Sequence, residues 1–195
     1  MEHITSKLLQ RLSESATIAM SRKARELKDQ GIDVISLSLG EPDFDTPDAM
    51  KQAGIDAIQA NETHYTPVPG TSRVRKAIVE KFKRDTGLIY GIDEVVVSTG
   101  AKQSLANVVL SLVDPGDEVI LPAPFWVSYE ELIKVAGGTP VIMPTSIDND
   151  YKVQPEELEA AITDKTRLVM YSSPCNPSGS VYTHDETAAL ADVLR

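Results

Sequence analysis

From residue 94 to residue 194 the sequence alternates short apolar runs with segments of helical periodicity, and this alternation restricts the fold more than any other feature. Short apolar runs bounded by turn residues are typical of buried strands, and the longer segments repeat apolar residues every three or four positions. Strands that alternate with helices of this length form a mainly parallel sheet with helices on both faces. The sequence therefore predicts a three-layer α/β/α fold. The expected strands are 95–98, 118–121, 141–144 and 167–171, and the expected helices are 101–112, 128–136, 155–162 and 184–194.

The residues before this region are expected to be mainly helical. The turn-rich segment 40–47 (GEPDFDTP) separates a first part from the rest, since Gly and Pro interrupt regular structure. We therefore expect an N-terminal piece of a small domain over 1–45 and the N-terminal portion of a larger domain over 46–195. Thr46 is expected to cap the helix that follows it. The expected elements are a helix over 19–30, a strand over 34–39, a helix over 47–60, a loop over 64–70 and a helix that carries Val74, Ile78, Val79 and Phe82.

The charge of the chain argues against two classes of partner. Its 29 acidic and 19 basic residues give a net charge of −10, which disfavours nucleic acid and anionic membrane surfaces. Cys175 is the only cysteine, so no internal disulfide is possible and a reducing compartment is expected. No stretch approaches the roughly 18 apolar residues of a membrane span, so we expect a cytoplasmic protein. The three histidines lack the spacing of metal ligands, and no metal site is predicted.

The most specific local motif is SPCNPSG at residues 173–179, directly after an expected strand. Its prolines cannot continue a strand, so they predict a fixed loop at the carboxyl end of the strand, where open α/β sheets bind ligands. Asn176 either caps its own turn or orients a ligand from a rigid backbone. Cys175 is disfavoured as a nucleophile, because no histidine or acid is paired with it in the sequence.

A second loop has the character of an anion site. Gly100, Ala101 and Lys102 join an expected strand to an expected helix. Small residues let the backbone approach an anion closely, and the N–H groups of the first helical turn favour a phosphate. Many α/β proteins have such a joint, and the spacing is neither the dinucleotide fingerprint nor a Walker A loop.

Two aromatic residues lie in proline-rich loops. Trp126, the only tryptophan, follows an expected strand in LPAPFW, and it is either a core aromatic or a stacking surface for a flat ligand. Tyr65 lies in HYTPVPG, a stiff loop that either packs the ring or presents its hydroxyl outward.

Taken in chain order, these loops resemble the class I aminotransferases of the pyridoxal-phosphate fold-type I superfamily. The similarity is greatest to the bacterial subgroup of aspartate and prephenate aminotransferases. This resemblance implies an incomplete fold-type I transferase fold and pyridoxal 5′-phosphate as cofactor. The matching stretches cover essentially the whole chain: SLSLGEPDFDTP at 36–47, YTPVPG at 65–70, STGAKQ at 98–103, DPGDEVILPAPFWVS at 114–128 and SPCNPSG at 173–179.

The resemblance also implies roles for individual residues toward the cofactor. Gly100, Ala101 and Lys102 would hold the phosphate at the start of the helix. Trp126 would stack on the pyridine ring, and Asn176 would donate a hydrogen bond to the phenolic oxygen of the ring.

Around the substrate, the resemblance places Gly40 beside the α-carboxylate, with Trp126 and Asn176 close by. Lys102 would pair with the distal carboxylate of a dicarboxylic amino acid or keto acid, although a solvated lysine is the alternative. Tyr65 would reach the cofactor phosphate of the neighbouring subunit, which implies a homodimer.

Two departures from the family pattern limit what we expect. Relatives with prephenate activity read KPSAT near the N-terminus, whereas residues 13–17 read SESAT, so the missing lysine weakens the case for prephenate unless Arg11 substitutes. The family's Schiff-base lysine, the aspartate that pairs with the pyridine nitrogen and two arginines lie farther along than Arg195. We therefore predict no catalytic residue in this chain and expect an inactive fragment.

The function that follows is the N-terminal half of an aspartate aminotransferase, which exchanges an amino group between aspartate and 2-oxoglutarate in a ping-pong cycle. One alternative is another fold-type I enzyme, either a prephenate aminotransferase or a C–S or β-eliminating lyase, because the cofactor supplies the chemistry and the site directs it. The other is a non-catalytic, self-associating fragment.

Overall fold

The computed structural model describes residues 4–37, 40 and 42–195. It contains two compact units, one formed by residues 1–38 with 105–195 and the other by residues 39–104. The first unit holds the sheet, and the second is helical. The division into domains predicted at residue 45 remains a prediction.

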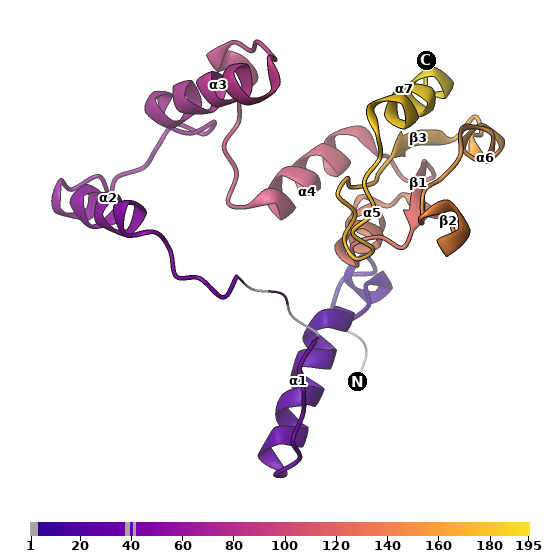
Figure 1. The fold of residues 1–195 in the computed structure, drawn as a ribbon, viewed down its shortest axis with the longest axis horizontal. Helices are drawn as coiled ribbons and strands as arrows, with labels where there is room; N and C mark the ends of the chain where they lie inside the picture. The colour runs from indigo at the N-terminus through magenta and orange to yellow at the C-terminus, as the bar shows by residue number, and fades with distance from the viewer. Residues whose placement is uncertain (1–3, 38–39, 41) are drawn as a thin grey trace. The chain divides into compact units, whose positions relative to one another are not determined.

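A parallel three-stranded sheet forms the centre of the first unit (Figure 1). The strands are β1 (Glu118–Ala123), β2 (Thr139–Pro144) and β3 (Thr166–Val169), in the order β2-β1-β3. Both neighbours run parallel to β1. Val119, Ile120 and Leu121 of β1 have no exposed surface, as expected for the central strand of a parallel sheet that is covered on both faces.

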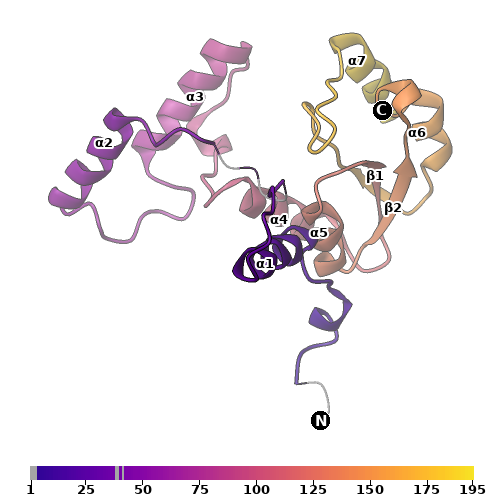
Figure 2. The same cartoon turned by 60° about the horizontal axis from the view of Figure 1, so that its bottom comes forward.

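Helices cover both faces of this sheet. Successive residues of β1 point to opposite sides, so its apolar side chains need a covering layer on each face. Val119 and Leu121 belong to a core cluster that includes Ile133. Ile120 belongs to a second cluster that includes Leu158. Figure 2 shows α6 and α7 together on one side of the sheet and α5 on the other. The predicted three-layer α/β/α fold is thus confirmed. Its helices are α4 (Ala101–Leu112) and α5 (Ser128–Ala136) on the first cluster, with α6 (Pro155–Ala161) and α7 (His184–Val193) on the second.

Local sequence signals account for where these helices begin and end. α5 stops at Gly137, which has a φ of 89° in the left-handed region that glycine adopts without strain. α6 begins with Pro155, whose missing N–H costs nothing in the first helical turn. α7 begins with a reciprocal cap, in which the Thr183 hydroxyl accepts from the Glu186 N–H and the Glu186 carboxylate accepts from the Thr183 N–H.

The second unit consists of two helices and a short 3₁₀ turn. Thr71 caps the second helix by accepting a hydrogen bond from the Val74 N–H at 3.4 Å. Gly70 has a φ of +95°, and a Cβ atom there would lie 2.8 Å from Val97 Cγ2, so a larger residue would clash as well as strain the backbone. Val95 is the only buried apolar residue among those described in this unit. The elements are α2 (Asp48–Gln59), α3 (Ser72–Thr86) and η2 (Ile92–Glu94).

The N-terminal segment contributes a short 3₁₀ turn, η1 (Leu9–Arg11), and the helix α1 (Ala16–Asp29). The helix expected over 19–30 is therefore confirmed and begins three residues earlier. Among the helices of the part that the structure describes, none is long and apolar enough to cross a membrane.

Three local expectations were wrong. Residues 34–37 of the strand expected over 34–39 are not in a strand, and 38–39 lie outside the described residues. Residues 95–98 form no strand either, and the Val97 N–H donates instead to the Pro69 carbonyl oxygen of a loop at 3.0 Å. A strand requires a paired neighbour, which an apolar run cannot guarantee. Thr46 does not cap α2, because the N-cap position is Pro47.

Candidate functional site

The carboxyl ends of β1 and β3 lead into the two loops that the sequence singles out, those of Trp126 and Asn176. Parallel strands end at the same edge of a sheet, which is where α/β proteins bind ligands. Here the two loops touch, because Cys175 Sγ donates to the Pro124 carbonyl oxygen at 3.3 Å. The structure therefore brings the Trp126 and Asn176 loops together, and their roles toward a ligand remain predictions.

A small pocket lies between these loops. Its volume is about 10 Å³, which is enough for one water molecule and too small for an aromatic ring. A planar ligand therefore does not fit inside this pocket. The pocket is lined by Pro122, Pro124, Phe125, Tyr151, Tyr171, Ser172, Cys175 and Tyr182.

Trp126 is partly buried, and both interpretations of it keep some support. Its ring packs against the first core cluster and lies edge-on to Tyr129, with ring centroids 5.7 Å apart and planes at 89°. This packing fixes the indole at the end of β1. The part of the residue that stays accessible is the surface on which a flat ligand would stack.

The Asn176 loop is closed by its own backbone. The Gly179 N–H donates to the Cys175 carbonyl oxygen and the Cys175 N–H donates to that of Ser180, both at 2.8 Å. Asn176 is exposed, and its backbone N–H donates to Ser172 Oγ at 3.3 Å. Within the described residues its side-chain amide has no hydrogen-bond partner, so the amide does not cap the turn.

Tyr182, just after this loop, is a residue that the sequence analysis missed. Its hydroxyl accepts a hydrogen bond from the Val153 N–H at 2.8 Å, and its backbone N–H donates to Ser173 Oγ at 3.0 Å. Its ring lies edge-on to Tyr171 at 5.2 Å. Burial raises the pKa of the Tyr182 hydroxyl, so the group stays protonated at neutral pH. Val153 lies 29 residues from Tyr182, so the sequence gives no sign of their hydrogen bond. The one available signal for Tyr182 is its position just after the motif at residues 173–179.

Lys152 forms an ion pair beneath the same tyrosine. Its ammonium lies 3.1 Å from both carboxylate oxygens of Glu186 and 5.9 Å from the centre of the Tyr182 ring. The hydrogen bond with Glu186 raises the pKa of Lys152. The pKa of Glu186 is lowered, first by the Thr183 backbone N–H and then by Lys152. Only 13% of the Lys152 side chain is exposed, so this pair is better shielded than a typical surface pair.

Gly100, Ala101 and Lys102 lie at the start of α4, in the second unit. Gly100 has a φ of +82°, and no atom lies within 4 Å of the position that a Cβ atom would take. The Thr99 N–H donates to Gln103 Oε1 at 2.5 Å and tightens the turn. The first helical turn is exposed and carries no acidic residue, so no carboxylate within that turn offsets the positive end of the helix dipole. This geometry suits a phosphate.

Tyr65 and Gly40, the other two predicted site residues, also belong to the second unit. Tyr65 is fully exposed, which excludes the packed alternative within this chain and leaves its hydroxyl accessible. Gly40 is exposed, and residues 39 and 41 beside it lie outside the described residues. The assembly of these residues with Trp126 and Asn176 into one site remains a prediction.

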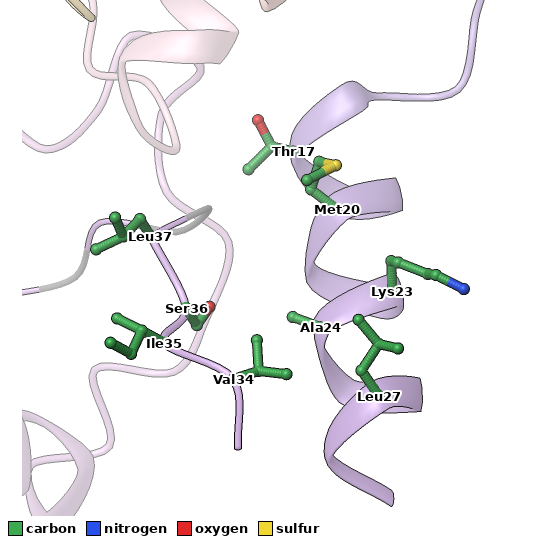
Figure 3. Close-up of a pocket in the computed structure, with 9 residues that line it drawn as sticks. All are labelled: Thr17, Met20, Lys23, Ala24, Leu27, Val34, Ile35, Ser36 and Leu37. Atoms are coloured by element: carbon green, nitrogen blue, oxygen red, sulfur yellow. The ribbon is translucent and has the colours of Figure 1, made fainter. Parts of the chain in front are cut away.

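A larger pocket lies elsewhere, in a groove between α1 and residues 34–37 (Figure 3). Its volume is about 490 Å³. Met20, Ala24 and Leu27 face Val34 across it, and it holds no predicted site residue. In the described ranges, no three His, Cys, Asp or Glu side chains gather as a metal site would require.

Comparison with known sequences identifies relatives along nearly the whole chain. The family described as aminotransferase class I and II matches residues 32–195. A probable aspartate/prephenate aminotransferase of Rhizobium leguminosarum bv. phaseoli is 53% identical over 95% of this chain, and an aspartate aminotransferase of Bacillus sp. (strain YM-2) is 45% identical over 99%. The chain spans about half the length of these curated relatives, 46% and 49%.

Solved structures give the same result. The aspartate aminotransferase of Rhizobium meliloti superposes with a TM-score of 0.94 at 43% identity, over 98% of this chain and 48% of the other. The aspartate aminotransferase of Thermus thermophilus with maleate superposes with a TM-score of 0.93 at 41% identity, over 98% of this chain and 50% of the other.

Proposed function

Because the chain belongs to the class I and II aminotransferases, we propose that it is the N-terminal, cofactor-holding part of an aspartate aminotransferase. Aminotransferases of this class depend on pyridoxal phosphate. The complete polypeptide would exchange an amino group between aspartate and 2-oxoglutarate. The observation that carries this proposal is the 53% identity over 95% of the chain to a probable aspartate/prephenate aminotransferase.

The residues of this chain fit the cofactor by their chemistry. When bound, pyridoxal phosphate supplies an electron sink that weakens the bonds at the α-carbon of an amino acid. The exposed start of α4 at Gly100 offers N–H groups and a positive dipole end to the phosphate. The accessible part of the Trp126 indole offers a surface to the ring. The Asn176 side-chain amide has no hydrogen-bond partner among the described residues, and its N–H can donate to the phenolic oxygen.

Specificity for a dicarboxylate rests on Lys102. We propose that its ammonium pairs with the distal carboxylate of the substrate, while the backbone at Gly40 lies beside the α-carboxylate. A carboxylate that loses water on binding needs such a partner, because an unpaired buried charge is costly. The solved Thermus thermophilus relative was obtained with maleate, which is itself a dicarboxylate.

Prephenate is the second candidate substrate, because several relatives are named aspartate/prephenate aminotransferases. Ser13 stands where the resemblance expects a lysine, and its backbone N–H donates to Glu131 Oε2 at 3.0 Å. This bond ties the segment to α5, where Glu131 also pairs with Lys134, and Ser13 itself supplies no cation. Aspartate therefore stays the first candidate. The homodimer and the cytoplasmic location remain predictions.

Binding of the cofactor tests the proposal directly on the 195-residue chain. Pyridoxine 5′-phosphate carries an alcohol in place of the aldehyde, so it cannot react with surface lysines. Because Trp126 is the only tryptophan, quenching of its fluorescence reports binding beside it. We expect saturable quenching that inorganic phosphate reverses, and no aspartate turnover from residues 1–195 alone.

Two lysine variants separate a specific site from charge attraction. Lys102→Ala removes a cation from the helix start that we propose holds the phosphate, and it should weaken binding about tenfold or more, as expected for the loss of one interaction between charged groups. Lys165→Ala removes an exposed lysine just before β3, at the amino-terminal end of the strand and away from the loops of Trp126 and Asn176. This variant should leave the affinity for the ligand unchanged. Quenching that never saturates, or equal losses in both variants, would argue against the proposed site.

A further inference from the structure

The loop that carries Asn176 is anchored from one side by a single residue. Tyr182 holds Ser173 at the start of the loop through its backbone N–H, at 3.0 Å. It also packs edge-on against Tyr171, which follows β3, with centroids 5.2 Å apart. Its hydroxyl accepts from the Val153 N–H at 2.8 Å, ahead of α6. Tyr182 thus links residues 171–173, through its ring and its backbone N–H, to the segment before α6, through its hydroxyl.

The anchor is itself held in place by charge. Lys152, next to Val153, pairs with Glu186 at the start of α7 and lies 5.9 Å from the centre of the Tyr182 ring. A cation within about 6 Å of a ring centre is attracted to its face. The ion pair therefore links the segment before α6 to the first turn of α7, next to the Tyr182 ring.

The loop has few other restraints. Its internal bonds run from Gly179 to Cys175 and from Cys175 to Ser180, so they shape the turn without fixing its position on the sheet. The Cys175 contact with Pro124 is a thiol bond, which is weak. The Ser180 hydroxyl also donates to Asp150 Oδ1, at 3.3 Å. The bonds of Tyr182 to Val153 and Ser173 are shorter, at 2.8 Å and 3.0 Å, so we take Tyr182 as the main anchor of the loop.

We propose that Tyr182 is a positioning residue that sets the orientation of Asn176 toward the cofactor ring, through its hydroxyl bond to Val153 and its backbone bond to Ser173. The proposal rests on the proposed function for the ring and on the contacts above for the anchoring. Tyr182→Phe keeps the ring, removes the hydroxyl and leaves the Val153 N–H without its acceptor. A matched control is Tyr151→Phe, in the same pocket, since the Tyr151 hydroxyl has no partner among the described residues.

The first test needs no ligand. Amide hydrogen exchange of the full chain should accelerate about tenfold at Cys175 and Gly179 in Tyr182→Phe, the effect expected for one lost hydrogen bond. In Tyr182→Phe the amides of α5 should keep wild-type exchange rates. In Tyr151→Phe the amides of Cys175 and Gly179 should also keep them. Unchanged loop exchange in Tyr182→Phe would overturn the anchoring.

The second test asks whether Tyr182 acts through Asn176. In the wild-type background Tyr182→Phe should weaken the binding of pyridoxine 5′-phosphate about threefold to tenfold and shift the ligand's absorption band in the same direction as we expect for Asn176→Ala. In the Asn176→Ala background it should add nothing. Full additivity would reduce Tyr182 to a structural role and overturn the proposal. If the wild-type chain binds no ligand, the proposed function fails, and the exchange test alone decides whether Tyr182 anchors the loop.

Discussion

Close contacts of single residues determine how tightly the core packs around β1. A Cβ atom at Gly138 would lie 2.6 Å from Val113 Cγ1 and 3.1 Å from Ile133 Cγ2. We predict that Gly138→Ala destabilises the chain by about 1–3 kcal/mol, because these buried side chains must shift to make room. Urea unfolding followed by Trp126 fluorescence measures this, since Trp126 packs against the same cluster as Ile133.

Gly54 provides the matched control. It lies inside α2, and no atom lies within 4 Å of the position of its Cβ atom. Gly54→Ala should stabilise that helix by up to about 1 kcal/mol and leave the Trp126 transition in place. An unchanged urea midpoint for Gly138→Ala would contradict the packing at Val113.

At the scale of elements, the start of α7 carries a pH dependence. The pKa of Glu186 is lowered from its ordinary value of 4.5 by the Thr183 N–H and by Lys152. A carboxyl group with a lowered folded-state pKa contributes stability above its ordinary pKa and loses it as pH falls through the folded value. We predict that wild type exceeds Glu186→Gln in urea midpoint at pH 7, and that the difference shrinks as pH falls below 4.5 and vanishes once pH is below the lowered folded-state pKa.

Glutamine keeps an oxygen that accepts from the Thr183 N–H, so this variant isolates the charge. At alkaline pH the limit is set by Lys152, whose pKa is raised above its ordinary value of 10.5. The stabilisation by the Lys152–Glu186 ion pair is therefore full below pH 10.5 and is lost as pH rises through the raised pKa. Glu156→Gln is the control, because Glu156 lies in the first turn of α6 without a partner among the described side chains. A pH-independent difference for Glu186→Gln would mean that the charge has no role in the cap.

The same elements show what sequence predicts well. α4 and α5 begin and end where expected, because apolar periodicity and capping residues are local signals. Residues 95–98 have the apolar character of a strand but no strand partner in the described chain, because pairing depends on distant backbone. The helices were thus predictable, whereas an apolar run predicted a strand only where a paired neighbour exists.

The candidate site divides along the same line. The positions of Asn176 and Trp126 at the carboxyl ends of strands were predictable, because proline-rich loops directly after apolar runs mark the end of a strand in the sequence itself. The bond from the Val153 N–H to the Tyr182 hydroxyl was not, since it joins residues whose proximity exists only after α6 and α7 pack together. The sequence thus predicts which loops lie at the carboxyl ends of the strands better than which residues hold those loops in place.

The whole molecule divides its buried surface unequally between the two units. Among the described residues, every buried apolar side chain except Val95 lies in residues 105–195. α2 and α3 contain no buried residue. Since burial of apolar surface is the main source of stability, the second unit should open by local unfolding well before the first.

Hydrogen exchange of the full chain tests this difference, together with two matched valine variants. Amides of α2 and α3 should exchange at least about 100-fold faster than those of β1 and α5. Val119→Ala, at a position with no exposed surface, should accelerate exchange in β1 and α5, since deleting buried methyl groups costs about 1–2 kcal/mol. Val95→Ala should act only on residues 42–104. Protection of α2 equal to that of α5 would mean that contacts outside those described stabilise the second unit, as a partner subunit would.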